Sequence, residues 1–229
     1  MAEEAGITMI PVYRLTSDSN HPGIPCWKDV VLGFRVVGSE ELSRLSVEHG
    51  RTYASGIHFV SFCCEPTKFL PYLTKRFLAA GGRIEKRKVS NLDEFNNASL
   101  IVNCSGLGSV EMTKDSKFHA IRGQVARVQA PWIYDVILHE DDEGNYIIPN
   151  TNCVILGGTH QVDDHNLKVS KADSDFIFNG CKKIFPSIQN ATTIIEVVGL
   201  RPGREEVRLE AEHRQGKPTV IHNVGHGKR

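Results

Sequence analysis

The chain has 229 residues, of which 40% are hydrophobic and 24% charged, as in an ordinary globular protein. Lysine plus arginine and aspartate plus glutamate number 27 each, so no basic excess favours nucleic acid or an anionic membrane as a partner. No apolar run reaches the roughly 20 residues that span a bilayer. The six cysteines form no CxxC pair, which indicates buried, reduced thiols. We therefore expect a soluble intracellular protein of one large domain or two small ones.

The middle of the chain predicts a helix followed by two strands. Residues 65–80 have Phe69, Leu73 and Phe77 at a spacing of four, and Gly81 supplies a stop, whereas Pro71 predicts a break or a late start. The runs at 83–89 and 99–106 are typical of strands, and the second ends in small residues. This order is typical of a nucleotide-binding α/β layer.

The second half is dominated by short β-rich runs. They lie at 124–132, 146–149, 153–158 and 191–200, without a helix between most of them, which favours an antiparallel sheet. Residues 173–184 predict one helix, with Phe176, Ile177, Gly180 and Ile184 on one face. The predicted fold is therefore mixed α/β, with a partial Rossmann-like layer interleaved with a mostly antiparallel sheet.

The segment VVGLRPGREEVRL at 197–209 contains the candidate binding residue. Arg201 follows an apolar strand-like run and precedes Pro202, which should end the strand pairing and hold the guanidinium at a strand edge. A planar guanidinium suits a carboxylate because it can donate two parallel hydrogen bonds. The alternative is a surface ladder of ion pairs, in which Arg201, Arg204 and Arg208 face Glu205, Glu206 and Glu210.

Six segments together resemble the D-amino-acid oxidase family of FAD enzymes. Besides VGLRPGREEVRLE they are VIHNVGHG at 220–227, NCSGLGS at 103–109, RGQVARVQAPW at 122–132, YIIPNTNCVILGGTHQ at 146–161 and WKDVVLGFR at 27–35. They stand in family order over nearly the whole chain. The resemblance implies a substrate-binding layer at 1–62 and 118–196 and an incomplete FAD-binding layer at 63–117 and 197–229.

The resemblance also implies the site residues. Arg201 matches the arginine that binds the substrate α-carboxylate, and Tyr146 matches the tyrosine whose hydroxyl contacts the same group. His139 lies where D-aspartate oxidases carry an arginine for the side-chain carboxylate, followed by the acidic stretch 141–143; the alternative is a solvated loop histidine. No side chain acts as acid or base, because the hydride passes to the flavin.

Cofactor contacts are implied at five positions. Val89 matches a backbone contact to the adenine, Ser105 and Gly106 a turn after a strand, and Gly225 and Gly227 the flavin-side glycines. No metal is expected, since the cluster of His160, Asp163, Asp164 and His165 is typical of a turn.

The ends of the chain depart from the family pattern. No GxGxxG turn occurs, Val224 replaces a tyrosine, and the chain ends at Arg229. We expect a truncated member of the family that purifies without FAD and is itself inactive. The partners expected for the family are a D-amino acid and oxygen, and the sequence is compatible with a homodimer; location should be peroxisomal or cytoplasmic.

The expected reaction is oxidative deamination of D-aspartate or D-glutamate to a 2-oxo acid, ammonia and hydrogen peroxide. NCSGLGS, GGTHQ and VGLRP look closer to the D-aspartate oxidase branch than to the neutral one. His139 motivates the first alternative, a neutral D-amino-acid oxidase. The second alternative is a truncated, non-catalytic isoform that cannot hold FAD.

Overall fold

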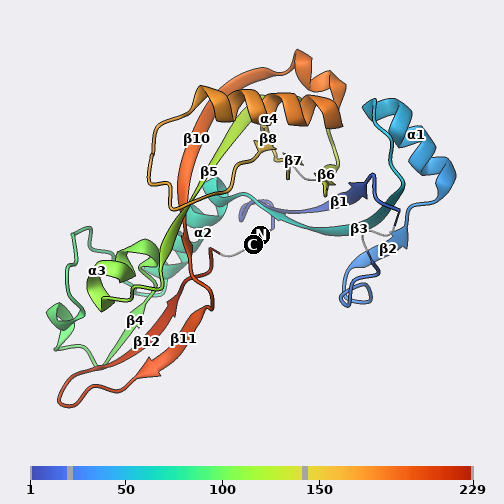
Figure 1. The fold of residues 1–229 in the computed structure, drawn as a ribbon. Helices are drawn as coiled ribbons and strands as arrows, with labels where there is room; N and C mark the ends of the chain where they lie inside the picture. The colour runs from blue at the N-terminus through green and yellow to red at the C-terminus, as the bar shows by residue number, and fades with distance from the viewer. Residues whose placement is uncertain (1, 20–22, 141–143, 228–229) are drawn as a thin grey trace. The chain divides into compact units, whose positions relative to one another are not determined.

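A computed structural model describes residues 2–19, 23–140 and 144–227. The chain forms two compact units, which are described separately below (Figure 1). The first comprises residues 1–84, 124–159 and 169–197, and the second 85–123, 160–168 and 198–229. This division groups 63–84 with the first unit, and 118–123 and 160–168 with the second, unlike the expected layers. The assignment of the units to substrate and cofactor stays a prediction.

The larger sheet confirms the mixed α/β class and is mostly antiparallel. Its strand order is β10-β5-β8-β7-β6-β1-β3-β2, with β9 paired to β5. The strands are β1 (Ile7–Thr16), β2 (Leu32–Val36), β3 (Ser55–Cys64), β5 (His119–Gln129), β6 (Val136–His139), β7 (Tyr146–Pro149), β8 (Val154–Gly157), β9 (Gln161–Val162) and β10 (Thr192–Gly203). Strands β1 and β6 run parallel, whereas β1–β3, β2–β3, β6–β7, β7–β8 and β5–β8 run antiparallel.

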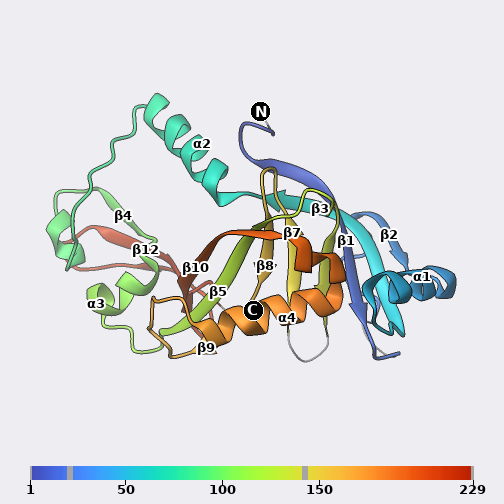
Figure 2. The ribbon, with the colours of Figure 1, turned by 90° about the horizontal axis from the view of Figure 1, so that it is seen from above.

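Helix α4 (Lys171–Ile184) covers one face of this sheet in the first unit and confirms the predicted helix (Figure 2). Its N-terminus is capped by Ser170, whose side chain accepts a hydrogen bond from the Asp173 amide. Ile177, Cys181 and Ile184 are fully buried in the main core cluster, whereas Phe176, expected on the same face, is 37% exposed. The core is therefore built where the apolar stripe of α4 meets the sheet.

Helix α2 (Pro66–Ala79) confirms the other predicted helix, but without the expected break at Pro71. Pro66 occupies the first turn, where its missing N–H has no helical partner in any case. Pro71 removes one further donor near the start of the helix, and the bonds of the later turns are intact. None of the residues of α2 is buried within the described structure. Helix α1 (Ser39–His49), which the sequence did not predict, buries Leu42 and Leu45.

The second unit is organised by a three-stranded sheet. Its order is β11 (Arg208–Glu212), β12 (Thr219–Val224) and β4 (Leu100–Asn103), in which β4 and β12 run parallel. The 3-10 turns at Leu92–Phe95 and Gly106–Gly108 and the short helix α3 (Ser109–Thr113) flank it; a third turn, Pro186–Asn190, belongs to the first unit. Leu92, Ile101 and Val220 form its core cluster.

The predicted strand at 83–89 is wrong, since the backbone there pairs with no described strand. A β-prone run becomes a strand only when a neighbour accepts its backbone hydrogen bonds. The segment is instead anchored by side chains, because Arg87 lies 4.8 Å from the Phe95 ring centroid and 3.3 Å from the Glu94 carboxylate.

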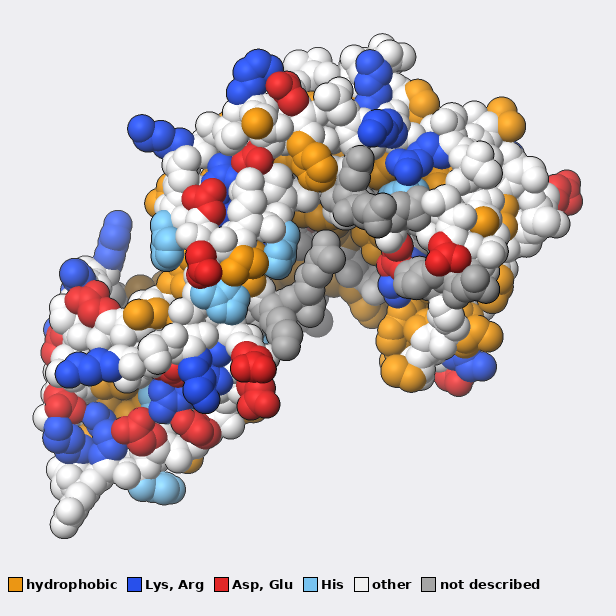
Figure 3. Space-filling model, viewed as in Figure 1, with side chains coloured by type: hydrophobic (Ala, Val, Ile, Leu, Met, Phe, Trp, Pro, Cys, Tyr) orange, Lys and Arg blue, Asp and Glu red, His pale blue; other side chains and the backbone are white. Residues whose placement is uncertain are grey.

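The cysteines and the surface charges bear on two expectations drawn from composition. All six cysteines are free, but only Cys181 is buried, and burial raises the pKa of its thiol to about 12. The expectation of buried thiols is wrong for the exposed Cys26, Cys64 and Cys104. Acidic and basic side chains are interspersed on the face in Figure 3, in keeping with their equal numbers. Among the described residues, no helix has the length and apolar character that crossing a bilayer requires.

Removal of a core side chain under α4 should destabilise the first unit. Leu156 of β8 has no exposed surface, so Leu156→Ala should lower the free energy of unfolding by roughly 2–5 kcal/mol, because it leaves a cavity. Val47→Ala, at a side chain 85% exposed, is the matched control. Urea unfolding followed by circular dichroism measures both; equal midpoints would contradict the described core.

Candidate functional site

Arg201 lies against the backbone of a neighbouring strand in the second unit. A Cβ atom placed on Gly123 of β5 would stand 2.4 Å from Arg201 Nη1 and 2.7 Å from its Cζ, so the guanidinium occupies the space that a side chain at Gly123 would fill. Arg201 is half-buried and Gly123 is buried. Strand β10 continues through Pro202 to Gly203, so the expectation that Pro202 ends the strand is wrong.

Arg204 and Arg208, the other two arginines of the motif, lie around the Asp115 carboxylate. Arg204 Nε lies 3.3 Å and Arg208 Nη1 3.6 Å from the Asp115 carboxylate, and Arg208 also contacts Glu210 and Glu212. Arg204 and Arg208 thus form an ion-pair cluster of the kind that the alternative of a ladder describes, and the guanidinium of Arg201 lies over Gly123.

Pro202 and Gly203 lie between two of the predicted cofactor glycines. The Gly227 amide donates to the Pro202 carbonyl at 2.8 Å, and a Cβ on Gly227 would stand 2.5 Å from the Pro202 carbonyl carbon. On Gly106 a Cβ would stand 3.8 Å from Pro202 Cγ. The segment that follows Arg201 is thus packed against Gly227 as closely as only a residue without a side chain allows, whereas its contact with Gly106 is an ordinary van der Waals contact.

The parallel pairing of β4 and β12 explains why these turns meet. Register places His222 beside Asn103, so the residues that follow both strands emerge at one edge of the sheet. They are the turn at Ser105–Gly106 and the turn at Gly225–Gly227. Gly106 has φ +57° and Gly225 φ +89°, a region that favours glycine. Ligands of α/β sheets commonly bind outside the carboxyl ends of parallel strands.

Val89 is half-buried in the extended segment that replaces the predicted strand. Its neighbourhood is ordered by Glu94, whose carboxylate accepts from the backbone amides of Ser90 (2.8 Å) and Asn91 (3.1 Å). These two hydrogen bonds fix the backbone directly after Val89. The role of Val89 in adenine binding stays a prediction.

Tyr146 of β7 lies over a pair of glycines in the first unit. It pairs with Gly157 of β8 in register, and a Cβ on Gly157 would stand 2.0 Å from Tyr146 Cζ. On Gly158 a Cβ would stand 2.9 Å from the Tyr146 hydroxyl oxygen. The ring therefore lies flat on the glycine backbone, as the guanidinium of Arg201 lies on Gly123 in the other unit.

His139 lies on the opposite face of the sheet from Tyr146. Leu138 pairs with Tyr146, and successive side chains of a strand alternate in direction, so His139 points the other way. Its ring centroid is 5.9 Å from that of Tyr53, and its side chain is 6% exposed. The alternative of a solvated loop histidine is wrong, and the geometry does not bring His139 to Tyr146. The acidic residues 141–143 lie outside the described residues.

His49, the last residue of α1, lies in the same buried cluster as His139. Its Nδ1 and the Tyr53 hydroxyl are 3.0 Å apart, and its ring packs against Phe185 at 5.1 Å between centroids. Burial, with smaller contributions from Arg44 and His139, lowers the pKa of His49 to about 4. His49 is therefore a neutral part of the core at neutral pH.

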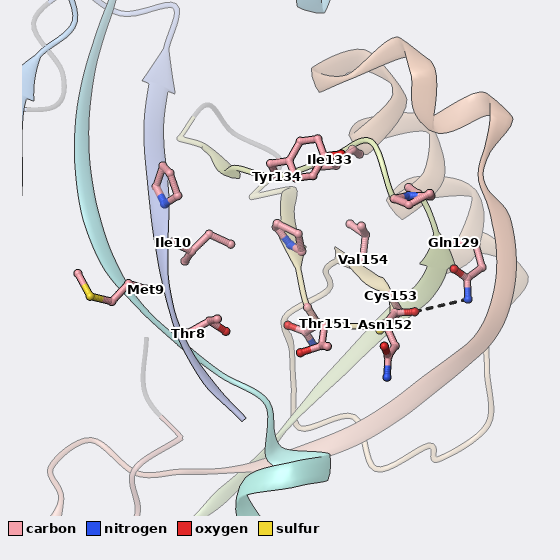
Figure 4. Close-up of a pocket in the computed structure, with 15 residues that line it drawn as sticks. Thr8, Met9, Ile10, Gln129, Ile133, Tyr134, Thr151, Asn152, Cys153 and Val154 are labelled. Atoms are coloured by element: carbon pink, nitrogen blue, oxygen red, sulfur yellow. Dashed lines mark hydrogen bonds between the residues drawn. The ribbon is translucent and has the colours of Figure 1, made fainter. Parts of the chain in front are cut away.

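A cavity of about 680 Å³ opens elsewhere in the first unit (Figure 4). It lies between the first half of β1, the segment after β5 and the hairpin that joins β7 to β8, where Gln129 donates to the Asn152 carbonyl at 3.4 Å. Among the described residues that line it, none carries a formal charge. The cavity therefore offers no cation to a carboxylate, and Tyr146 does not line it.

Several residues of this arrangement escaped the sequence-based prediction. Gly123, Gly157 and Gly158 matter because a side chain there would displace Arg201 or Tyr146. A glycine inside a strand-like run was the available signal, since it often marks close approach. Among the described residues, no group of three or more His, Cys, Asp or Glu side chains could hold a metal ion.

Comparisons with known proteins show the family of the chain. Residues 9–229 match the family model described as DAO, FAD dependent oxidoreductase, and the chain belongs to this family. Human D-aspartate oxidase is 39% identical over 99% of this chain and 66% of its own length. A D-amino acid oxidase of Dugesia ryukyuensis is 38% identical over 84% of this chain and 60% of its own length. The chain thus spans less than two thirds of these relatives.

Solved structures support the fold. The glycine oxidase of Geobacillus kaustophilus aligns with a TM-score of 0.82 over 99% of this chain and 70% of that protein, at 15% identity. Family membership indicates FAD as the cofactor. The turn at Gly106 fits such a group, since Gly106 has no side chain and the nearest atoms to a Cβ placed there lie 3.8 Å away, on Pro202.

Substitution at Gly123 should displace Arg201 while the fold is retained. The atoms that Gly123→Ala would meet belong to the end of a flexible side chain, so the guanidinium can move away. Gly199→Ala, on the same strand as Arg201 and with nothing within 4 Å, is the matched control. Because the family resemblance assigns Arg201 to the substrate carboxylate, we expect Gly123→Ala to raise KM at least about tenfold, a loss of about 1.4 kcal/mol, with little change in Tm. Equal KM values for both variants would contradict the described contact.

Acid should destabilise the protein through His49. Its folded pKa of about 4 is below the ordinary 6.5, so the unfolded chain binds the proton more tightly. The stability that neutral His49 contributes is complete above pH 6.5 and falls by about 3 kcal/mol as the pH drops to 4. His49→Gln, which cannot be protonated, should show a correspondingly smaller loss in thermal unfolding between pH 7 and 4. Parallel pH profiles of Tm would rule out this contribution.

Proposed function

We propose that the protein is an FAD-dependent oxidase that deaminates D-amino acids, with D-aspartate and D-glutamate as the preferred substrates. The overall reaction converts the D-amino acid, oxygen and water to a 2-oxo acid, ammonia and hydrogen peroxide. The observation that carries the proposal is the half-buried guanidinium of Arg201, which lies over Gly123 beside the glycine turns that follow β4 and β12.

In this proposal Arg201 binds the α-carboxylate of the substrate. Its contact with Gly123 restricts the guanidinium to a few orientations before substrate arrives, which lowers the entropic cost of a two-point hydrogen bond. The family resemblance alone makes Tyr146 a second candidate to donate, through its hydroxyl, to the substrate carboxylate. Its ring is held flat by Gly157 and Gly158, so the hydroxyl direction is fixed as well. Bound FAD supplies the hydride acceptor.

No side-chain base is assigned to the α-hydrogen. The two carboxylate contacts would orient the substrate so that this hydrogen leaves as a hydride and the neutral amino group provides the electrons for the C=N bond. Positioning of this kind can supply a large share of a rate enhancement. The turns at Ser105–Gly106 and Gly225–Gly227 would lie against the cofactor, where glycine lets the backbone approach closely.

The preference for acidic substrates is supported by the similarity to human D-aspartate oxidase, which extends over 99% of the chain. The alternative of a preference for neutral D-amino acids was motivated by His139. This residue is buried against Tyr53, on the face of the sheet opposite to Tyr146. A neutral D-amino-acid oxidase is the second candidate, since the chain is also 38% identical to a D-amino acid oxidase of Dugesia ryukyuensis.

Steady-state rates of hydrogen peroxide release test the proposal. The purified protein, supplied with FAD, should oxidise D-aspartate with a higher kcat/KM than D-alanine and leave L-aspartate unchanged. Faster turnover of D-alanine would replace the acidic preference by the neutral one. Absence of both FAD binding and turnover would reject the oxidase function and favour a non-catalytic role.

Removal of the guanidinium tests the role of Arg201. Arg201→Ala should lower kcat/KM roughly 30- to 1,000-fold, because a charge-assisted pair of hydrogen bonds is lost. This factor corresponds to a loss of about 2–4 kcal/mol of transition-state stabilisation. Arg201→Lys keeps the charge but not the planar pair of donors, so it should restore only part of the rate. The control is Arg204→Lys in the Asp115 cluster. An unchanged KM for Arg201→Ala would remove this residue from the site.

A further inference from the structure

A chain of hydrogen bonds that is buried at His222 and Asn103 runs through the second unit to the Ser105–Gly106 turn. Glu212 of β11 lies 2.9 Å from Nε2 of His222 on β12, and Nδ1 of His222 lies 3.2 Å from Nδ2 of Asn103 at the end of β4. The Oδ1 atom of Asn103 accepts from the backbone amide of Ser105 at 3.2 Å and from its hydroxyl at 2.7 Å. His222 has no exposed surface, and Asn103 is 3% exposed.

These contacts specify one tautomer and one amide orientation. A carboxylate can only accept, so Nε2 of His222 carries the hydrogen and Nδ1 is left as an acceptor. The NH2 group of Asn103 must then face His222, where it also donates to Ser109 Oγ at 3.2 Å. Its oxygen is consequently turned toward Ser105. Reversal of the Asn103 amide would place its NH2 group against the Ser105 N–H, two donors facing each other.

The cost of burying these groups indicates that they serve more than stability. Apolar side chains of similar size would fill the same space without needing partners, whereas each buried polar group must be satisfied. The network makes a single conformation of the turn favourable, which apolar side chains would not do. Ser105 also bonds Ser109 Oγ at 2.8 Å, and the turn continues into Gly106 with φ +57°.

We propose that His222 is a positioning residue, which holds Asn103 in one amide orientation and thereby shapes the Ser105–Gly106 turn to receive the dinucleotide cofactor. Glu212 fixes the tautomer of His222, and His222 fixes the amide orientation of Asn103. The Asn103 oxygen then accepts the hydrogen bonds of Ser105 in the turn. The cofactor part of this proposal rests on the proposed function, whereas the effect on the turn does not. None of the three side chains needs to touch the cofactor.

Hydrogen exchange tests the effect on the turn without any cofactor. In His222→Leu the Ser105 amide should exchange at least about tenfold faster, because Asn103 is released and its bond to that amide opens more often. Nitrogen NMR of the unaltered protein should show His222 with hydrogen on Nε2 and a bare Nδ1. Hydrogen on Nδ1, or an unchanged exchange rate at Ser105, would overturn the proposal.

Paired variants at Glu212 guard against a misfolded His222→Leu. Glu212→Gln retains an oxygen that accepts from His222 Nε2, so it should keep Ser105 protected, whereas Glu212→Leu should lose that protection. A purely structural role for Glu212 would not distinguish them in this way. Asn223→Asp, at the exposed neighbour of His222 on β12, is the control and should behave as the unaltered protein.

FAD affinity, measured from the quenching of flavin fluorescence, tests whether the shape of the turn affects cofactor binding. The Kd should rise about tenfold in His222→Leu and Glu212→Leu and stay within about twofold in Glu212→Gln and Asn223→Asp. Equal affinities in all variants would overturn the link to the cofactor. If the unaltered protein binds no FAD, the proposed function and this link both fail, and the exchange rates still decide whether His222 shapes the turn.

Discussion

The contact of candidate site residues with bare glycine backbone is the constraint that the structure imposes within each of the two units. Arg201 lies over Gly123, Tyr146 lies over Gly157 and Gly158, and Pro202 packs against Gly227. In each case a methyl group would take the space of the neighbouring atoms. A long side chain held flat against a strand has few rotamers left, so less entropy is lost when it binds a ligand.

The second unit adds a polar counterpart to this packing. The parallel pair β4 and β12 delivers two glycine turns to one edge, and the buried groups Asn103 and His222 stand directly before those turns. An apolar sheet would support the same strands but would leave the direction of each turn unspecified. Arg204 and Arg208 form ion pairs with Asp115 in the adjoining segment, whereas the guanidinium of Arg201 lies over Gly123.

Much of the fold could be predicted from local patterns. Helices α2 and α4 follow from apolar residues at a spacing of three to four, and strands β4, β5, β7, β8 and β10 from β-branched runs. The strand predicted at 83–89 failed for a physical reason: its residues favour extended backbone, but no described strand lies beside them to complete a ladder. Pro71 failed as a helix breaker because the surrounding turns keep their own hydrogen bonds.

The sequence by itself determined the family, the mixed α/β class and the segment that holds Arg201, because these depend on residue identity along a short stretch. Tertiary structure alone decided which face each side chain occupies. His139 and Tyr146 are seven residues apart, yet register turns them to opposite faces of the sheet, since every one-residue step along a strand reverses direction. It also decided that Glu212, His222 and Asn103 meet, because their three strands are adjacent only after the chain has folded.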